Sequence, residues 1–235
     1  MSDARFSSTR FYPSLTLNSV VPRVEKEIKF SPRPETLRRL VTGVGEQIHN
    51  RDVYCGFPRI EGVEYPLIQQ NAWLRRRNGE YELKLVTESN RDGGVKVSKE
   101  IPPSQVEDTL DSLLAEHDVD QGGLTDSRLE PLVYVSTSRR RYTKEAETEG
   151  VDEFKVDLDR VRFWHDLEHG WAQPGEPDMT WLVGEIDITA KGTQAAKEEI
   201  DRVTTEYDLD TYRKRKVVTF FREANSDVYG YIPDS

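Results

Sequence analysis

Residues 24–29 read Val-Glu-Lys-Glu-Ile-Lys, a short segment in which charged and apolar residues alternate. This alternation predicts a β-strand, because successive side chains of a strand point to opposite faces. Glu25, Glu27 and Lys29 then share one face, about 7 Å apart at successive same-face positions. Carboxylates bind hard cations such as Mg²⁺, and a lysine ammonium is a point charge suited to phosphate. The strand can therefore offer a metal site beside an anion site.

A polar stripe on one strand is most often the solvated face of an antiparallel sheet, so this strand alone does not define a site. The same arrangement recurs, however, in later segments. Solvated faces usually mix in serine, threonine, glutamine and asparagine, whereas these faces are almost purely ionic. The predicted same-face sets are Trp73, Arg75 and Arg77; Glu82 and Lys84; Lys155, Asp157 and Asp159; and Glu185 and Asp187. If the strands form a barrel with these faces inward, its interior combines an anion-binding set with a metal-binding set.

Composition narrows the class of protein. The chain has 235 residues, 35% hydrophobic and 32% charged, which is enough for a sizeable core. Its formal net charge of −10 argues against nucleic-acid binding through a basic surface. Cys55 is the single cysteine, which excludes an internal disulfide framework and fits a reducing, cytoplasmic location. No run of 18 apolar residues is present, so we expect no transmembrane helix and no membrane partner.

The chain divides into two parts. Residues 1–21 are predicted to form an N-terminal arm, and residues 22–235 a single domain. A mitochondrial presequence in residues 1–20 is the alternative for the arm, which Asp3 and the short length disfavour. We expect a monomer whose partner is a small molecule.

Strands outnumber helices in the predicted domain. Apolar spacing predicts helices at 34–48, 104–116 and 193–207, the second opened by a capping box from Ser104 to Glu107. Alternation predicts strands at 22–30, 51–55, 70–77, 80–87, 94–101, 131–143, 151–164, 179–190 and 212–222. Asn78-Gly79 and residues 91–95 indicate hairpin turns. Strands joined by tight turns predict one antiparallel α+β domain.

Residues 165–178 interrupt the strand pattern and are predicted to form a loop. The segment begins with His-Asp-Leu-Glu-His, which fits the H-x-x-E-H pattern of one class of zinc proteases. That chemistry needs a helix that places both histidines on one face. The glycines and prolines that follow directly prevent a long helix, so we discount a zinc protease.

The ordered set of motifs resembles the CYTH superfamily, the triphosphate tunnel metalloenzymes. Glu25-x-Glu27-x-Lys29 is similar to the signature of that family, and the segments 73–77, 82–84, 156–159 and 184–187 follow in the family's order. The similarity extends from about residue 22 to about residue 222 and is greatest to the thiamine triphosphatase branch. It implies an eight-stranded closed antiparallel β-barrel with a few flanking helices, whose tunnel binds a triphosphate.

The resemblance also implies roles for individual residues. A divalent cation, Mg²⁺ or alternatively Mn²⁺, would be held by Glu25, Glu27, Asp157, Glu185 and Asp187. Phosphate oxygens would be held by Lys29, Arg75, Arg77, Lys84, Arg139, Arg141 and Lys216. Glu100 would be a further acidic tunnel residue, Tyr54 would pair with Lys29, and Trp73 would contact the thiazolium ring of thiamine triphosphate. Water activation would fall to a carboxylate such as Glu27 or to the Lys29–Tyr54 pair, with the carboxylate preferred.

The expected reaction is metal-dependent hydrolysis of the terminal phosphate of thiamine triphosphate. Inorganic tripolyphosphate is the alternative substrate for the same chemistry. A nucleotide enzyme on the same barrel, an adenylate cyclase or an RNA 5′-triphosphatase, is a second alternative, although the acidic composition argues against RNA. A non-catalytic polyphosphate-binding module is a third, which would not need the five predicted metal-binding carboxylates.

Overall fold

The computed structural model describes residues 23–60, 62–88, 97–115, 129–165, 175–212, 215–224 and 226–233. Its largest feature is a nine-stranded sheet in the order β11-β1-β10-β9-β8-β2-β5-β6-β7, in which every recorded pair is antiparallel. The strands of this sheet are β1 (Arg23–Phe30), β2 (Glu46–Gly56), β5 (Ala72–Arg77), β6 (Glu80–Glu88), β7 (Val97–Ile101), β8 (Glu130–Glu145), β9 (Val151–Trp164), β10 (Met179–Lys191) and β11 (Thr211–Tyr212). The predicted α+β class with a large antiparallel sheet is confirmed.

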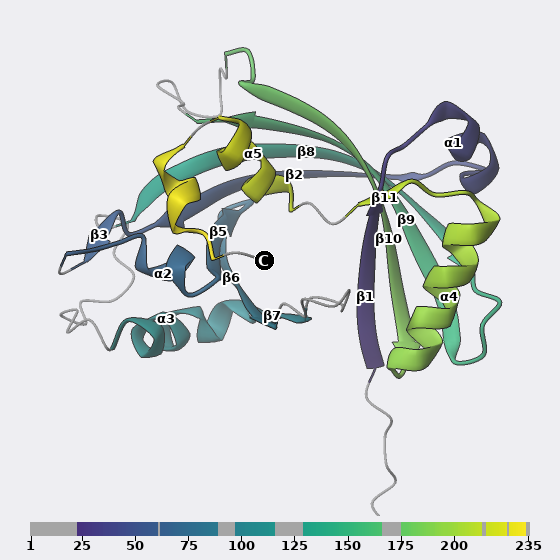
Figure 1. Cartoon of the computed structure of the whole chain (residues 1–235), viewed down its shortest axis with the longest axis horizontal. Coiled ribbons are helices and arrows are strands. Elements are labelled where there is room, and N and C mark those ends of the chain that lie inside the picture. The colour runs from purple at the N-terminus through teal and green to yellow at the C-terminus, as the bar shows by residue number, and fades with distance from the viewer. Residues whose placement is uncertain are drawn as a thin grey trace, which may run out of the picture.

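Short helices surround the sheet. They are α1 (Pro34–Leu40), α2 (Pro66–Gln69), η1 (Pro103–Gln105), α3 (Val106–Leu114), α4 (Thr193–Glu206), α5 (Lys216–Glu223) and η3 (Asp227–Tyr231). A two-stranded ribbon of β3 (Arg59–Ile60) and β4 (Val63–Glu64) lies outside the main sheet. Figure 1 shows α4 alongside β1 and β10, and α5 near the other end of the long strands. In the described residues no helix is both long and apolar enough to cross a membrane.

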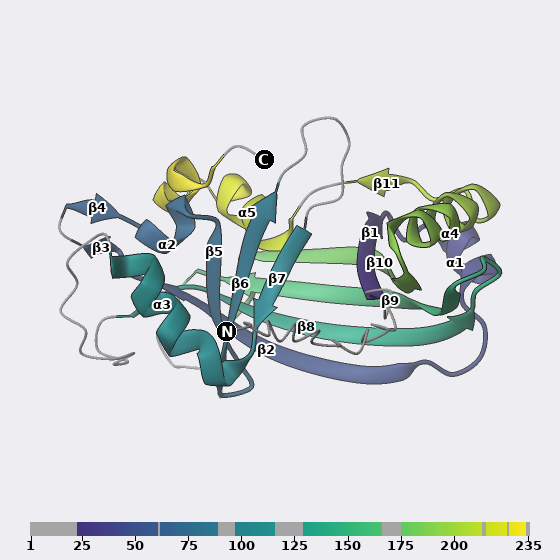
Figure 2. The ribbon, with the colours of Figure 1, turned by 90° about the horizontal axis from the view of Figure 1, so that it is seen from below.

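The sheet is curved but is not a closed barrel in the part of the chain that is described. Figure 2 shows the long strands β2, β8 and β9 running across the molecule, with β5–β7 and β1 turned away from them at opposite ends. The sheet ends at β11 on one side and at β7 on the other, and no pairing joins these ends among the described strands. The predicted eight-stranded closed barrel is therefore not confirmed. A period-two pattern predicts which residues face inward but does not say whether the outer strands pair.

The two faces of the sheet have different chemistry. The face that α4 covers carries a hydrophobic cluster that includes Phe30, Phe154, Val156, Ile186 and Ile188, all at most 1% exposed. The opposite face, here called the inner face, carries the charged residues that alternate with these positions. Further along β8, β9 and β10 the inner face carries a second apolar cluster, which includes Val135, Phe163 and Val183 and packs against α5. The charged part of the inner face is thus bordered by hydrophobic packing.

The predicted helix at 34–48 is too long. The helix ends at Leu40, and β2 begins at Glu46. The backbone is already extended at Val41, and Gly43 between the two elements has a φ of +83°, which L-residues rarely adopt. The strand predicted at 51–55 is correspondingly too short, because β2 runs from Glu46 to Gly56.

The predicted strand at 212–222 is wrong. Among the described residues of this segment, Thr211–Tyr212 form a two-residue strand and Lys216–Glu223 form helix α5. Val217, Phe220 and Phe221 are buried at positions i, i+3 and i+4, which is helical spacing. Tertiary packing of this apolar stripe overrides the β-propensity of its valine, threonine and phenylalanine residues.

Some of the other predicted elements are confirmed and others are wrong. The helix at 193–207 is confirmed as α4, and the Asn78-Gly79 hairpin is confirmed, with φ of 49° and +103° as a type I′ turn requires. The capping box at Ser104 is wrong, because Ser104 lies in the 3₁₀ turn η1 and α3 starts at Val106. The N-terminal arm, the turn at 91–95 and most of the 165–178 loop lie outside the described residues.

Candidate active site

Strand register brings the predicted site residues onto shared rows of the inner face. One row runs Lys29, Glu185, Asp157 and Arg141 across β1, β10, β9 and β8. Directly opposed residues in antiparallel strands point to the same face with their Cβ atoms about 5 Å apart. The predicted sharing of faces within each segment therefore extends across the strands, and it places the acidic strands β9 and β10 beside basic residues of β1 and β8.

Arg139 is the central cation of the acidic region. Its guanidinium donates two hydrogen bonds of 2.8 Å to Asp159 and one of 2.7 Å to Glu185, and it also forms an ion pair with Asp157. These carboxylates are deeply buried, with Asp157, Asp159 and Glu185 at 0%, 2% and 3% exposure. Burial alone would lower the pKa of Arg139, but the neighbouring carboxylates raise it. The buried negative charge is thus held by a guanidinium that stays protonated.

Glu185 is held by lysines from two distant parts of the chain. The Lys216 ammonium lies 2.8 Å from Glu185 and 2.5 Å from Asp159, and Lys29 lies 3.4 Å from Glu185 while also pairing with Glu27. Burial would raise the pKa of Glu185, but Lys216, Lys29 and Arg139 lower it to about 2. Burial lowers the pKa of Lys29, whereas the two carboxylates outweigh burial and raise that of Lys216. Lys216 contacts these carboxylates from the first turn of helix α5, and not from the strand that was predicted for this segment.

Asp187 differs from its acidic neighbours. Arg141 donates two hydrogen bonds of 2.8 and 2.7 Å to Asp157 but lies 3.9 Å from Asp187. Burial and the charges of Glu185 and Asp157 raise the pKa of Asp187 to about 6. The nearby cations therefore do not fully compensate the charge of Asp187, although Arg139 and Arg141 partly offset its repulsion by Glu185 and Asp157.

The donor set around Asp187 fits a hard divalent cation. Asp187 lies opposite Glu27 across β1 and β10, on the row next to Glu185. Among the described residues no group of three or more histidine, cysteine, aspartate or glutamate side chains is arranged as a metal site, and the Glu25 side chain is not described. Mg²⁺ is commonly bound by one or two carboxylates together with substrate phosphates, and not by a complete protein cage. Glu27 and Asp187 match that mode, because Glu27 is exposed although it pairs with Lys29, and Asp187 lies 3.9 Å from Arg141. Asp157 and Glu185 are instead buried in close ion pairs with arginine and lysine.

The other predicted cations lie on β5 and β6. Arg75 donates a 2.7 Å hydrogen bond to Glu82, and Arg77 donates two, of 2.8 and 3.0 Å, to the buried Asp52. Lys84 lies 3.9 Å from Glu100, which faces it from β7, so the predicted tunnel acid Glu100 is on the same face but exposed.

Tyr54 is placed differently from the expectation. Tyr54 lies directly opposite Arg75 of β5, with which it interacts electrostatically, and the Tyr54 ring makes an edge contact with Trp73 at 6.4 Å. Lys29 instead pairs with Glu27 and Glu185. The predicted Lys29–Tyr54 pair is therefore absent from the described contacts, because Tyr54 lies on β2 beside β5 while Lys29 lies on β1, several strands away in the sheet.

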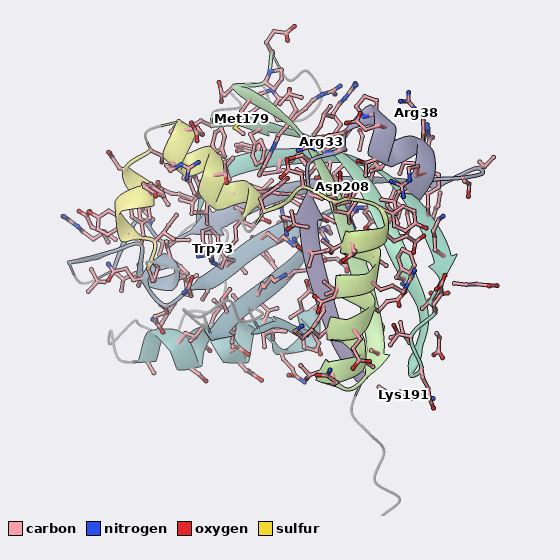
Figure 3. The ribbon with its side chains drawn as sticks, turned by 45° about the vertical axis from the view of Figure 1, so that its right-hand side comes forward. Arg33, Arg38, Trp73, Met179, Lys191 and Asp208 are labelled. Atoms are coloured by element: carbon pink, nitrogen blue, oxygen red, sulfur yellow. The ribbon has the colours of Figure 1, made fainter. Side chains whose placement is uncertain are left out.

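Trp73 lies at the β5 end of the site, where Figure 3 shows it below α5. The residue is 7% exposed, and the guanidinium of Arg215 lies over its ring, 5.5 Å from the centroid. Sequence reasoning did not assign Arg215, Asp52 or Glu82 a role. The alternation of β2 and β6 places Asp52 and Glu82 on the inner face, but nothing in the sequence pairs them with particular arginines.

The charged side chains of the inner face are held to one another by ion pairs. Two surface hollows of about 770 and 610 Å³ lie elsewhere, one beside η3 and Tyr65, the other on the outer face beside Arg160 and Arg162. The candidate active site, as far as its residues are described, is a set of interlocked ion pairs. A ligand would bind by exchanging some of these pairs for its own.

Comparisons with solved structures give distant matches. A protein proposed to be an adenylate cyclase from Bacillus halodurans has a TM-score of 0.45 at 15% identity over 84% of this chain and 98% of that one. The PH1819 protein of Pyrococcus horikoshii has a TM-score of 0.45 at 17% identity, over 86% and 99%. HpAC1 from Hippeastrum, described as an adenylyl cyclase candidate with a dominant triphosphatase activity, has a TM-score of 0.48 at 17% identity, over 86% and 96%.

No protein-family model matches the chain, and no curated protein sequence is significantly similar to it. TM-scores and identities at the level of the three structural matches do not carry an activity from those proteins to this chain.

Proposed function

We propose that the chain is a CYTH-type triphosphatase that hydrolyses the terminal phosphoanhydride bond of a small triphosphate with the help of a divalent cation. The observation that carries the proposal is the register of the inner face, where one continuous row places the two acids Glu185 and Asp157 side by side between Lys29 and Arg141. The motif order that resembles the CYTH superfamily supports the same reading.

The ion-pair network explains why both charge sets are needed. A triphosphate carries several negative charges, and each unit pair at 4 Å contributes about 4 kcal/mol of attraction at an effective dielectric near 20, before desolvation. Arginine suits this ligand because its fork binds two phosphate oxygens at once. If Arg139 and Arg141 turn toward phosphate, however, Asp157 and Asp159 lose positive charge while still buried. A second source of positive charge must then compensate the carboxylates.

A divalent cation held by Glu27 and Asp187 would supply that charge and polarise the phosphate oxygens it touches. The cationic residues of the chain would bind the remaining phosphate oxygens. Arg75, Arg77 and Lys84 neutralise the phosphate chain on one side, and Lys29 and Lys216 on the other. A carboxylate of the acidic set, such as Glu27, would orient a water for in-line attack and accept its proton.

Thiamine triphosphate is the substrate that the sequence pattern favours, because Trp73 shares a face with Arg75 and Arg77 and an aromatic ring can stack on a thiazolium cation. Inorganic tripolyphosphate is the second candidate. The Arg215 guanidinium already lies over the Trp73 ring, which favours a ligand without a cationic group at that position. No described feature marks a purine-binding pocket for a nucleotide enzyme.

Phosphate release by the purified protein tests the proposal. The assay compares thiamine triphosphate, tripolyphosphate and ATP with Mg²⁺, with an EDTA control. We expect EDTA-sensitive release from one of the first two substrates. Glu27→Gln should remove activity at constant Mg²⁺ while the unfolding curve stays cooperative. Full activity of that variant with an unchanged Mg²⁺ requirement would refute the metal role of Glu27, and absence of turnover with all three substrates would refute the triphosphatase.

A further inference from the structure

Two neighbouring side chains at the β5 end of the site have buried donors that lack acceptors. The Trp73 indole Nε1 and the Arg215 Nε and Nη2 atoms are buried without a hydrogen-bond partner in the described structure. A buried donor left unpaired costs free energy, so native proteins usually satisfy such groups with protein, water or ligand. Three unpaired donors on two neighbouring side chains point to a hydrogen-bond acceptor that binds between or beside them.

Arg215 differs from the other arginines of the site. Arg75, Arg77, Arg139 and Arg141 all donate to a carboxylate. Arg215 donates through Nη1 to the neutral side-chain oxygen of Asn71 at 3.1 Å, and it has no ion pair among the described residues. Burial lowers its pKa with no carboxylate to oppose the effect. Its charge is thus available to an anionic ligand without breaking an existing ion pair.

The position of Arg215 brings it into the proposed site. It directly precedes Lys216, whose ammonium contacts Asp159 and Glu185. Arg215 is also the N-cap of the eight-residue helix α5, whose first turn favours negative charge through the helix dipole. Two consecutive residues therefore contact two different parts of the site. Lys216 contacts the acidic strands β9 and β10, and Arg215 contacts Trp73 and Asn71 beside β5.

We propose that Arg215 and the indole NH of Trp73 form an oxyanion-binding subsite that holds phosphate oxygens of the substrate at the β5 end, and that this subsite selects inorganic polyphosphate chains over triphosphates with a cationic substituent. This inference rests on the proposed function. A thiazolium at Trp73 would meet the Arg215 guanidinium on the same ring, which replaces an attractive contact with repulsion between two cations. The oxygens of a phosphate group at that position would instead accept hydrogen bonds from the unpaired N–H donors of Trp73 and Arg215.

Arg215→Met tests the subsite, because methionine keeps much of the apolar stem but removes the charge and the donors. We expect it to raise the KM for tripolyphosphate at least tenfold with kcat within about threefold, and to lower the KM for thiamine triphosphate. Arg222→Met is the matched control on the same helix, because Arg222 is exposed and contacts only Glu223 among its described ion pairs. It should leave both constants unchanged. Equal KM changes for the two substrates, or none, would overturn the selectivity.

Trp73→Phe is the second variant, since it removes the indole NH and keeps an aromatic ring. It should raise the KM for tripolyphosphate and leave the melting temperature close to that of the wild type. Calorimetric binding of tripolyphosphate to wild type and Arg215→Met separates the two proposals. Binding that depends on Arg215 without any turnover would support the subsite and refute the triphosphatase. Turnover with identical tripolyphosphate affinity in both proteins would refute the subsite and support the triphosphatase.

Discussion

Replacement of Arg139 by methionine should destabilise the protein strongly, although the residue lies in the candidate active site. Arg139 pairs with three buried carboxylates, those of Asp157, Asp159 and Glu185. Removing one partner of a buried ion pair typically costs 3–5 kcal/mol, because a charge remains buried without compensation. Here Arg141 still pairs with Asp157, and Lys216 still pairs with the other two. We therefore expect a loss near the lower end of that range, about 3 kcal/mol.

Urea unfolding followed by tryptophan fluorescence measures this change, with the slope m as a check that the unfolded state is unaffected. Lys197→Met is the control, because Lys197 forms an exposed i,i+4 pair with Asp201 on α4 and should have no resolvable effect. The double variant Arg139→Met/Asp159→Asn should recover part of the loss, since it removes one of the stranded charges. A loss below about 1 kcal/mol for Arg139→Met, or no recovery in the double variant, would refute the view that this network is a buried, mutually compensating unit.

Two further predictions concern packing outside the site. Burial would raise the pKa of Glu199, but hydrogen bonds from Arg202 and Thr148 lower it below 4.5. The ionised carboxylate therefore stabilises the fold fully at pH values above its pKa in the unfolded chain. This stabilisation is lost as the pH falls through its lower pKa in the folded protein. Glu199→Gln should therefore lower the unfolding free energy at pH 7 by about 1.5–3 kcal/mol and flatten its fall below pH 4.5; parallel pH profiles for the two proteins would contradict this. Gly184→Ala would place a Cβ 2.3–2.5 Å from the ring of the fully buried Phe30, which should cost about 1–3 kcal/mol. Gly175→Ala, which meets nothing within 4 Å, is its control, and equal melting temperatures for the two variants would argue against the clash.

The inner-face residues of β1, β9 and β10 were predictable because a strand has a strict side-chain period of two. Alternation alone assigns Glu27 and Lys29, or Glu185 and Asp187, to one face whatever their partners are. It does not say which strands lie side by side. The proximity of Lys29 to Glu185 follows from the pairing of β1 with β10, which the sequence pattern does not contain.

The predictions failed where tertiary contacts decide the local structure. The segment that begins at Lys216 has the residue types of a strand, and only packing of its buried phenylalanines shows that it is a helix. Barrel closure, which is not confirmed among the described strands, likewise depends on pairing between strands far apart in the chain. Tyr54 was assigned to Lys29 through a family pattern, whereas its neighbours on β5 bring it to Arg75.

The convergence of Lys29 and Lys216 on Glu185 has a consequence for biosynthesis. The strands that bury Asp159 and Glu185 leave the ribosome before the segment that contains Lys216. Until that segment docks, both carboxylates lack one of their cations, so the nascent sheet carries excess negative charge in its interior. Contacts between residues so distant in sequence also form slowly, because loop closure must precede them. We therefore expect the last step of folding to be the docking of α5, and ribosome-bound chains that stop before residue 215 to lack the finished network.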